Sequence, residues 1–337
     1  MTDPTLGICI PTYNRSKYIE ELLSSIHLQG YTDIEVVISD NASIDNTKEV
    51  VSRYSALLPC LRYVYSDINV GADRNLLKCI SYSTADYCWI MGSDDALLPG
   101  SLDHILTQLK EHHPLSGISL GLSICDSQLK PLPNPVPIAG GVLQGDVLFQ
   151  NCDECISVLG LYFGFFSGQI VNRVIWSLVV QEYRALEHAN GFVIVYCIGH
   201  ILRYYPKWLY IHRPCVLNRT GNDSILSELG LYKRQYLAHV IFSQTLSTIC
   251  HKSSAPYRSV LKMALHTYLI RDFLGYRFEC ISLVTLFRLS LIYIRVYASF
   301  WSFWLLMLPL LFTPRMLLLL IKSAYIKFAG TKIRSFF

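Results

Sequence analysis

One short stretch near residue 90 constrains this chain most, because it places two adjacent acids at the end of an apolar run. The run Tyr87–Met91 has about the length of an average strand, and Gly92 and Ser93 lead from it to Asp94 and Asp95. Two carboxylates at the end of a buried strand repel each other and lose water. A hard divalent cation, Mg²⁺ or Mn²⁺, would relieve both costs. The alternative is that one acid caps the following helix or turn.

The first 125 residues alternate between strand and helix patterns. Apolar runs predict strands at residues 6–10, 34–39, 61–65, 87–91 and 118–124, with a helix after each of the first four. Ser16 and Ser101 stand where helix N-caps are expected. This alternation predicts an α/β fold with a mostly parallel sheet and helices on both faces.

Four polar loops follow the first four predicted strands, at residues 11–15, 40–45, 67–75 and 92–95. In open parallel sheets, ligands bind outside the carboxyl ends of the strands. Because the topology brings the four loops to that edge, we expect them to form one binding site.

The composition divides the chain into unequal parts. It has 337 residues, of which 52% are hydrophobic and 16% charged, and the apolar excess lies mainly after residue 280. The formal net charge of +4 is too small to indicate a nucleic-acid partner, whereas basic residues near the C-terminal apolar region favour an anionic membrane surface. We expect two halves of an α/β domain, residues 1–125 and 126–228, and a helical region at 229–337. Residues 131–137 are proline-rich and predict a linker or an edge segment.

The C-terminal region predicts membrane association. Residues 296–312 carry no charge, but that span is at the short limit for crossing a bilayer and contains Pro309. Arg288 and Arg295 are two helical turns apart and share a face. We predict helices that lie in the membrane interface, with a true span or a buried core or dimer helix as alternatives. No secretory signal is visible, so we expect a peripheral or monotopic protein on the cytoplasmic face of the inner membrane.

The second half carries weaker signals. The aromatic run at residues 161–166 predicts either core packing or a ring that stacks on a sugar. Cys152 and Cys155 form a lone CxxC pair with too few further ligands for a zinc site. Residues 218–224 form a polar loop, in which Arg219 is either a phosphate clamp or part of an ordinary turn.

Four motifs, at residues 10–15, 39–45, 69–75 and 92–95, occur in the order and spacing of a known enzyme family. Together they resemble the family 2 glycosyltransferases, enzymes of the GT-A fold, over about the first 125 residues. Residues 89–97 and 219–224 more narrowly resemble the O-antigen abequosyltransferases and related 3,6-dideoxyhexose transferases. The resemblance implies a nucleotide-sugar donor and a divalent cation, Mn²⁺ or Mg²⁺.

The same resemblance implies which residues hold the donor. The first two loops would line the nucleotide pocket, with Asp40 accepting a hydrogen bond from the base or the ribose, and Arg74 would lie near the diphosphate or the sugar. The implied donor-binding set is Pro11, Thr12, Tyr13, Arg15, Asp40, Asn41, Arg74, Ser93, Asp94, Asn222 and Asp223. The family places an acid where Gly92 stands here. We therefore expect the metal to be held by Asp94 and by oxygens of the diphosphate.

Glycosyl transfer leaves negative charge on the departing diphosphate, which the cation and Arg219 or Arg74 are expected to stabilise. If the reaction inverts the anomeric centre, a base must take the acceptor proton, whereas a retaining enzyme needs no such base. Candidates for this base are Asp153, Glu154, Glu187 and His188. Of these we prefer Glu187, and Asp95 is expected to orient sugar hydroxyls or share the cation. The predicted catalytic set is Asp95, Glu187, His188 and Arg219.

The expected function is sugar transfer from a nucleotide-sugar to a polyprenyl-diphosphate-linked oligosaccharide in O-antigen lipopolysaccharide synthesis. The narrower resemblance implies a CDP-3,6-dideoxyhexose donor such as CDP-abequose. Two alternatives stay open. A sugar-phosphate nucleotidyltransferase would use a glycine-rich loop, which residues 11–15 do not contain. A non-catalytic, membrane-attached glycan-binding scaffold would be insensitive to Asp94→Asn.

Overall fold

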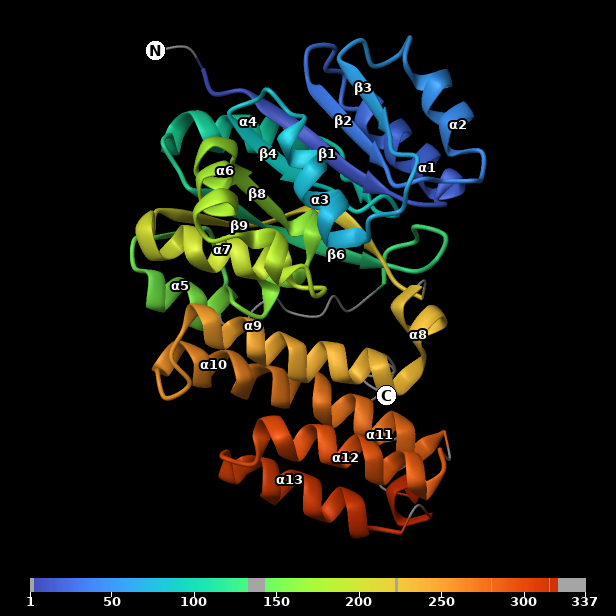
Figure 1. Cartoon of the computed structure of the whole chain (residues 1–337), viewed down its shortest axis with the longest axis vertical. Helices are drawn as coiled ribbons and strands as arrows, with labels where there is room; N and C mark the ends of the chain where they lie inside the picture. The colour runs from blue at the N-terminus through green and yellow to red at the C-terminus, as the bar shows by residue number, and fades with distance from the viewer. Residues whose placement is uncertain (1–2, 133–142, 222–223, 280, 315, 321–337) are drawn as a thin grey trace. The chain divides into compact units, whose positions relative to one another are not determined.

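The computed structural model describes residues 3–132, 143–221, 224–279, 281–314 and 316–320 (Figure 1). The chain forms two compact units, Met1–Asn222 and Asp223–Phe337. Strands from the second predicted half complete the same sheet as those of the first, so both halves belong to one unit. Most of the predicted linker at residues 131–137 lies outside the described residues.

The first unit is built on one mixed sheet, in which the described residues supply nine strands. They are β1 Leu6–Thr12, β2 Glu35–Asp40, β3 Leu61–Tyr65, β4 Tyr87–Ile90, β5 Ala96–Leu97, β6 Gly117–Cys125, β7 Val147–Phe149, β8 Gln169–Asn172 and β9 Trp208–Arg219. The order is β3-β2-β1-β4-β8-β6-β9-β5, and β7 pairs with β9. As predicted, β1 to β4 pair in parallel, whereas β8 runs antiparallel to both β4 and β6. The carboxyl ends of the first four strands therefore meet at one edge.

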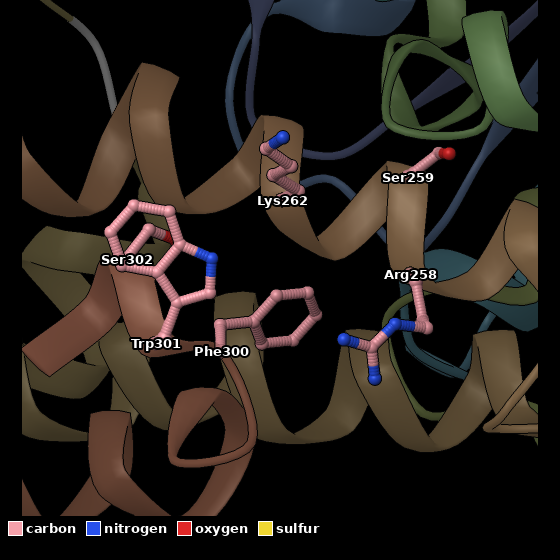
Figure 2. A pocket seen from close by; sticks show the side chains of 6 residues that line it. All are labelled: Arg258, Ser259, Lys262, Phe300, Trp301 and Ser302. Atoms are coloured by element: carbon pink, nitrogen blue, oxygen red, sulfur yellow. The ribbon is translucent and has the colours of Figure 1, made fainter.

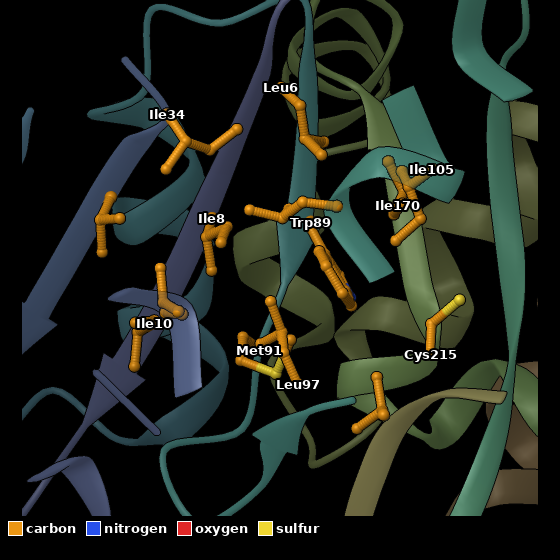
Figure 3. Close-up of a cluster of buried hydrophobic side chains, with 14 of the residues drawn as sticks. Leu6, Ile8, Ile10, Ile34, Trp89, Met91, Leu97, Ile105, Ile170 and Cys215 are labelled. Carbon is orange, nitrogen blue, oxygen red and sulfur yellow. The ribbon is translucent and has the colours of Figure 1, made fainter. Parts of the chain in front are cut away.

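Helices pack on both faces of this sheet because the buried strands are apolar on both sides. Ile8 and Ile10 of β1 join Trp89 of β4 in the large core cluster, to which α1 and α4 contribute (Figure 3). On the other face, the Cys79 thiol of α3 donates a hydrogen bond to the Val37 carbonyl of β2. The helices and short 3₁₀ turns of this unit are α1 Ser16–His27, α2 Thr47–Tyr54, α3 Ala72–Ser81, α4 Ser101–His112, α5 Cys152–Leu159, η2 Tyr162–Gly164, η3 Phe166–Gly168, α6 Arg173–Glu182, η4 Ala185–His188 and α7 Val193–Tyr204.

The predicted helix caps Ser16 and Ser101 are wrong, and Asp45 accepts the hydrogen bond at the start of α1. The Asp45 carboxylate accepts the Ser16 N–H at the start of α1 (2.9 Å) and the Thr47 N–H at the start of α2 (3.2 Å). One acid thus caps two helices, since both begin at the same edge of the sheet. The Ser101 hydroxyl donates instead to the Cys215 carbonyl of β9 (2.8 Å).

The second unit is helical. Its elements are α8 Ser224–Gln235, a π-helical turn η5 Tyr236–Ile241, α9 Phe242–Ile249, α10 Ala255–Ala264, a second π-helical turn η6 Leu265–Leu269, α11 Ile270–Phe278, α12 Leu283–Tyr297 and α13 Trp301–Phe312. The buried His239 ring hydrogen-bonds with Tyr297 (2.8 Å) and Gln235 (3.0 Å), and burial lowers the pKa of His239 to about 3. Among the described residues, no helix is both long and apolar enough to cross a membrane.

Candidate active site

The first two polar loops are tied together by reciprocal hydrogen bonds. The Asn14 N–H donates to the Ser43 hydroxyl oxygen (2.8 Å), and the Ile44 N–H donates to the Asn14 side-chain oxygen (2.9 Å). Asn14 adopts a positive φ of 52°, a conformation that asparagine tolerates better than most residues. The loop after β1 therefore has a fixed position against the loop after β2.

The second and third loops are fastened by two side-chain amides. The Asn41 amide donates to the Asn69 side-chain oxygen (2.8 Å) and accepts the Val70 N–H (2.8 Å). In the same way, the Asn75 side chain accepts the Ser39 hydroxyl (2.7 Å) and donates to the Ser39 carbonyl (2.9 Å). Ser39 and Asn41 lie at or next to the end of β2 and Asn75 lies in the first turn of α3, so the predicted meeting of these loops is present.

The fourth loop carries the two acids, which have different surroundings. Asp95 is buried, and its carboxylate accepts the Arg219 N–H (2.8 Å), the Asn218 amide (3.2 Å) and the Ser167 hydroxyl. Burial and then the neighbouring Asp94 charge raise the pKa of Asp95 to about 6, against the opposing effect of these hydrogen bonds. The Asp94 side chain is 27% exposed, and its carboxylate lies 3.9 Å from the guanidinium of Arg15 in the first loop.

Gly92 occupies the position where the family pattern has an acid, and the geometry explains the glycine. A Cβ at Gly92 would lie 3.2 Å from the Asp94 carboxylate, 3.2 Å from the Ser167 hydroxyl and 3.3 Å from the Asp95 carboxylate. The Gly92 N–H also donates to the Ser167 hydroxyl oxygen (2.8 Å). The loop folds so closely over residue 92 that a side chain there would displace the acids that follow.

Arg219 is held by several contacts within the protein. Its side chain is fully buried, donates to the Asp94 carbonyl (2.7 Å) and to the Ser127 carbonyl, and forms an ion pair with Glu21. The guanidinium also lies 4.8 Å from the centre of the Tyr18 ring. These contacts hold the Asp94 backbone in place, and the contact of Arg219 with the leaving diphosphate stays a prediction.

Asp40 accepts hydrogen bonds within the protein at the end of β2. It is fully buried, and its carboxylate accepts the Ser43 N–H (2.8 Å) and the Tyr63 hydroxyl (2.6 Å). These two bonds shape the second loop, and because a carboxylate has about four acceptor sites, the predicted bond from a base or ribose stays a prediction.

The remaining predicted donor residues lie in the first and fourth loops or outside the described residues. Thr12 is buried, and among the described residues its hydroxyl has no hydrogen-bond partner. Tyr13 is 41% exposed and Pro11 is half-buried. Ser93 is buried. Asn222 and Asp223 lie outside the described residues.

A cavity of about 260 Å³ lies where the third loop meets the segment before α7. It is lined by Val70, Gly71, Ala72, Asp73, Arg74, Ala189 and Gly191. The buried Asp73 carboxylate accepts the Gly191 N–H (2.7 Å) and the Val193 N–H (3.4 Å), and burial raises the pKa of Asp73 despite these bonds. Asp73 therefore fastens this segment to α3, and Arg74 is exposed at the cavity beside it.

The predicted base candidates divide between two places. Glu187 and His188 immediately precede the cavity-lining Ala189. Glu187 is exposed and pairs with Arg184 at 3.4 Å, while the His188 ring stacks on Tyr196 with 4.1 Å between ring centres. Asp153 pairs with Arg203 (2.9 Å), and the neighbouring Glu154 lies in the first turn of α5, where its N–H donates to Asn151.

The side chains that could act as metal ligands limit how a divalent cation can be held. Within the described part of the chain, no group of three or more His, Cys, Asp and Glu side chains is placed to bind a metal. Asp95 is occupied by its three hydrogen-bond donors, whereas the Asp94 carboxylate is partly exposed. These residues fit a cation held by Asp94 together with oxygens of a bound diphosphate.

Several positioning residues were missed from the sequence. Ser167 joins Gly92 to Asp95, yet it follows an aromatic run that carries no motif. Asp73 lies within the third motif, but its partners Gly191 and Val193 are 118 and 120 residues away. Two rings of the aromatic run are core: Phe163 packs edge-on against Trp208, and the Tyr162 hydroxyl donates to the Leu120 carbonyl. Phe165 and Phe166 are half-buried, so a ring that stacks on a sugar stays a prediction.

Comparison with known proteins agrees with this geometry. Residues 7–141 match the family described as Glycosyl transferase family 2. The chain is 34% identical over 288 residues to "Abequosyltransferase RfbV" of Salmonella typhimurium, covering 79% of this chain and 80% of that protein. Two solved structures share the fold at low sequence identity. TarS residues 1–349 of S. aureus with UDP-GlcNAc has a TM-score of 0.63 at 14% identity, covering 96% of this chain and 88% of that one. The mannosyltransferase PcManGT of Pyrobaculum calidifontis with GDP-Man and Mn²⁺ has a TM-score of 0.52 at 17% identity, covering 97% and 81%.

The identity to the Salmonella protein extends over most of both chains and well beyond the family motifs at residues 10–95. The structural neighbours place the mixed sheet in the GT-A fold. An enzyme of this family is therefore expected in place of either alternative, the nucleotidyltransferase or the silent scaffold. The chain belongs to the family 2 glycosyltransferases.

Proposed function

We propose that this glycosyltransferase moves a 3,6-dideoxyhexose such as abequose from a CDP-linked donor to a polyprenyl-diphosphate-linked oligosaccharide of O-antigen synthesis. The choice of sugar is supported by the similarity to a protein named abequosyltransferase over four-fifths of its length. The observation that carries the use of a nucleotide donor is the convergence of three cross-linked loops on the Asp94 carboxylate through Arg15.

The proposed donor site uses groups that are available at this edge. The buried Thr12 hydroxyl lacks a partner among the described residues, so it can bond to the nucleotide, and the exposed Tyr13 ring can pack against the base. The Arg15 guanidinium, 3.9 Å from Asp94, lies where a diphosphate would bridge the two. A divalent cation held by Asp94 would supply positive charge to the diphosphate oxygens.

The proposed reaction joins the acceptor oxygen to the anomeric carbon as the bond from that carbon to the diphosphate breaks. The electron pair of the broken bond stays on the diphosphate, where Arg15 and Arg74 stabilise it. For an inverting reaction, the acceptor proton passes to the Glu187 carboxylate, because Glu187 is exposed two residues before the cavity-lining Ala189. The ion pair of Glu187 with Arg184 is exposed and therefore weak enough to open.

The lipid-linked acceptor and the membrane surface are proposed from the second unit. Two of its helices leave large apolar side chains exposed at helical spacing, which an aqueous surface disfavours. These residues, the apolar face, are Val284, Phe287, Leu291 and Ile294 on α12 and Trp301, Trp304, Leu305, Leu308 and Phe312 on α13. The exposed Arg288 and Arg295 accompany them on α12. Apolar side chains flanked by cations suit an in-plane position at an anionic leaflet, on the cytoplasmic side where such acceptors are built.

A transfer assay with a panel of donors tests this function. Purified enzyme is given CDP-abequose or a UDP-, GDP- or dTDP-hexose with a polyprenyl-diphosphate oligosaccharide, and products are followed by mass. We expect transfer from the CDP donor that requires a divalent cation. Transfer only from a UDP, GDP or dTDP sugar would refute the proposed donor. Transfer to the free oligosaccharide that equals transfer to the lipid-linked one would refute the proposed acceptor.

A further inference from the structure

A second cavity, separate from the sugar-transfer site, lies within the helical unit. It has a volume of about 240 Å³ and is lined by Arg258, Ser259 and Lys262 of α10 and by Phe300, Trp301 and Ser302 at the start of α13. Figure 2 shows the Phe300 ring between Trp301 and the Arg258 guanidinium, with the Lys262 side chain farther along α10. The proposed sugar transfer uses none of these residues.

The chemistry of this cavity suits a phosphate group. Arg258 and Lys262 are exposed and four residues apart on one helix, so their charges lie on the same face. None of the described residues that line the cavity is acidic. Within the described part of the chain, no ion pair includes Arg258 or Lys262. Two cations on one helix, with no acidic partner among the described residues and with the hydroxyls of Ser259 and Ser302 beside them, form a donor set for an anion.

Of the two aromatic residues of the cavity, Phe300 contacts the arginine and Trp301 indicates how deep the cavity would lie in a bilayer. The Arg258 guanidinium carbon lies 5.0 Å from the centre of the Phe300 ring, a cation–π contact that restrains the arginine side chain. Trp301 is 77% exposed at the rim. Tryptophan is enriched at the boundary between lipid tails and headgroups, because its ring is apolar and its N–H is polar.

The cavity is continuous with the apolar face described above, since Trp301 belongs to both. A ligand phosphate in the cavity would therefore lie at the level of lipid headgroups when the apolar face contacts lipid tails. The volume is below the roughly 300–1,000 Å³ typical of sites for drug-sized molecules. It suits a phosphate with a short polar substituent better than a nucleotide.

We infer that this cavity binds the phosphate headgroup of an anionic membrane lipid and so orients the helical unit on the bilayer. The inference rests on the membrane location in the proposed function and adds a specific lipid contact to it. The Arg258 and Lys262 side chains bind the phosphate oxygens, and Trp301 packs at the glycerol level beside them.

Vesicle co-sedimentation of the full-length chain tests this inference. Vesicles of phosphatidylcholine alone are compared with vesicles that also contain phosphatidylglycerol, for the native protein and for R258Q/K262Q. The matched control K48Q/K78Q removes the same charge from two exposed sites of the first unit. We expect the native protein and the control to prefer the anionic vesicles. R258Q/K262Q should lose about thirtyfold in that preference, since each basic residue at an anionic surface contributes about 1 kcal/mol.

Equal losses in R258Q/K262Q and K48Q/K78Q would show that overall charge, and not the cavity, sets the preference, and would overturn the inference. A second arm measures thermal unfolding with inorganic phosphate and no vesicles. Stabilisation of the native protein but not of R258Q/K262Q, without any vesicle preference, would make the cavity a site for soluble phosphate and would also overturn it.

Transfer to a detergent-solubilised acceptor separates this inference from the proposed function. R258Q/K262Q is expected to keep its native unfolding temperature and its native rate in that assay while losing the vesicle preference. A native protein that prefers anionic vesicles but transfers no sugar would contradict the proposed function alone.

Discussion

Replacing Ser167 by alanine tests how the acid-bearing loop is held. The Ser167 hydroxyl donates to the buried Asp95 carboxylate and accepts the Gly92 N–H at 2.8 Å. A hydrogen bond to a charged group contributes about 1.5–3 kcal/mol, and an N–H left without its acceptor costs about 1 kcal/mol more. We therefore expect Ser167→Ala to lower the free energy of unfolding by about 3 kcal/mol at neutral pH.

Urea unfolding followed by tryptophan fluorescence measures this loss. Ser157→Ala is the control, because that hydroxyl bonds only within α5, to the Asp153 carbonyl four residues earlier (2.6 Å). The control should change stability by less than about 0.5 kcal/mol. The Ser167→Ala loss should shrink below the Asp95 pKa of about 6, where the acid is protonated and the bond is no longer charged. A loss no larger than that of the control would refute the reasoning.

Three further changes test the site and its frame. Gly92→Asp, which restores the family acid, should lower both stability and sugar transfer, because the added side chain meets Asp94 and Ser167; unfolding and turnover measured together check this, and a faster, equally stable variant would contradict it. Asp73→Asn should weaken the hydrogen bonds to the segment before α7. We expect kcat/KM to fall roughly tenfold in steady-state kinetics, with a small change in the calorimetric unfolding temperature; unchanged kinetics would count against this role. Burial raises the pKa of Glu35, but hydrogen bonds from residues 83–85 outweigh it, so the pKa is lowered and its stabilisation is lost as pH falls. Glu35→Gln should be less stable than the native protein near neutral pH and lose less on acidification, which unfolding temperatures across pH would show; parallel pH profiles would be inconsistent with this cause.

The convergence of the four loops could be predicted because it depends only on strand order. Alternating strand and helix patterns place each loop at the same edge, and this placement does not depend on the contacts of the loop side chains. The observed bonds of Asn14 to Ser43 and of Asn41 to Asn69 follow from that placement.

The roles of individual polar residues could not be predicted in the same way. Whether Arg219 faces a ligand or the protein depends on Glu21 and Tyr18, which are nearly 200 residues earlier in the sequence. Ser16 looks like a helix cap locally, but Asp45 takes that role from a neighbouring loop. Competition between local and distant partners is decided by tertiary packing, which a motif does not contain.

Stabilisation of the protein by nucleotide and cation tests most directly whether Asp94 forms a donor site. Unfolding temperatures are measured with CDP, UDP, GDP and dTDP, each with and without Mn²⁺, for the native protein and for Asp94→Asn. We expect CDP with Mn²⁺ to raise the unfolding temperature of the native protein most, and Asp94→Asn to lose the part that depends on Mn²⁺. A native protein indifferent to every nucleotide, or an Asp94→Asn variant that responds to Mn²⁺ as the native protein does, would contradict it.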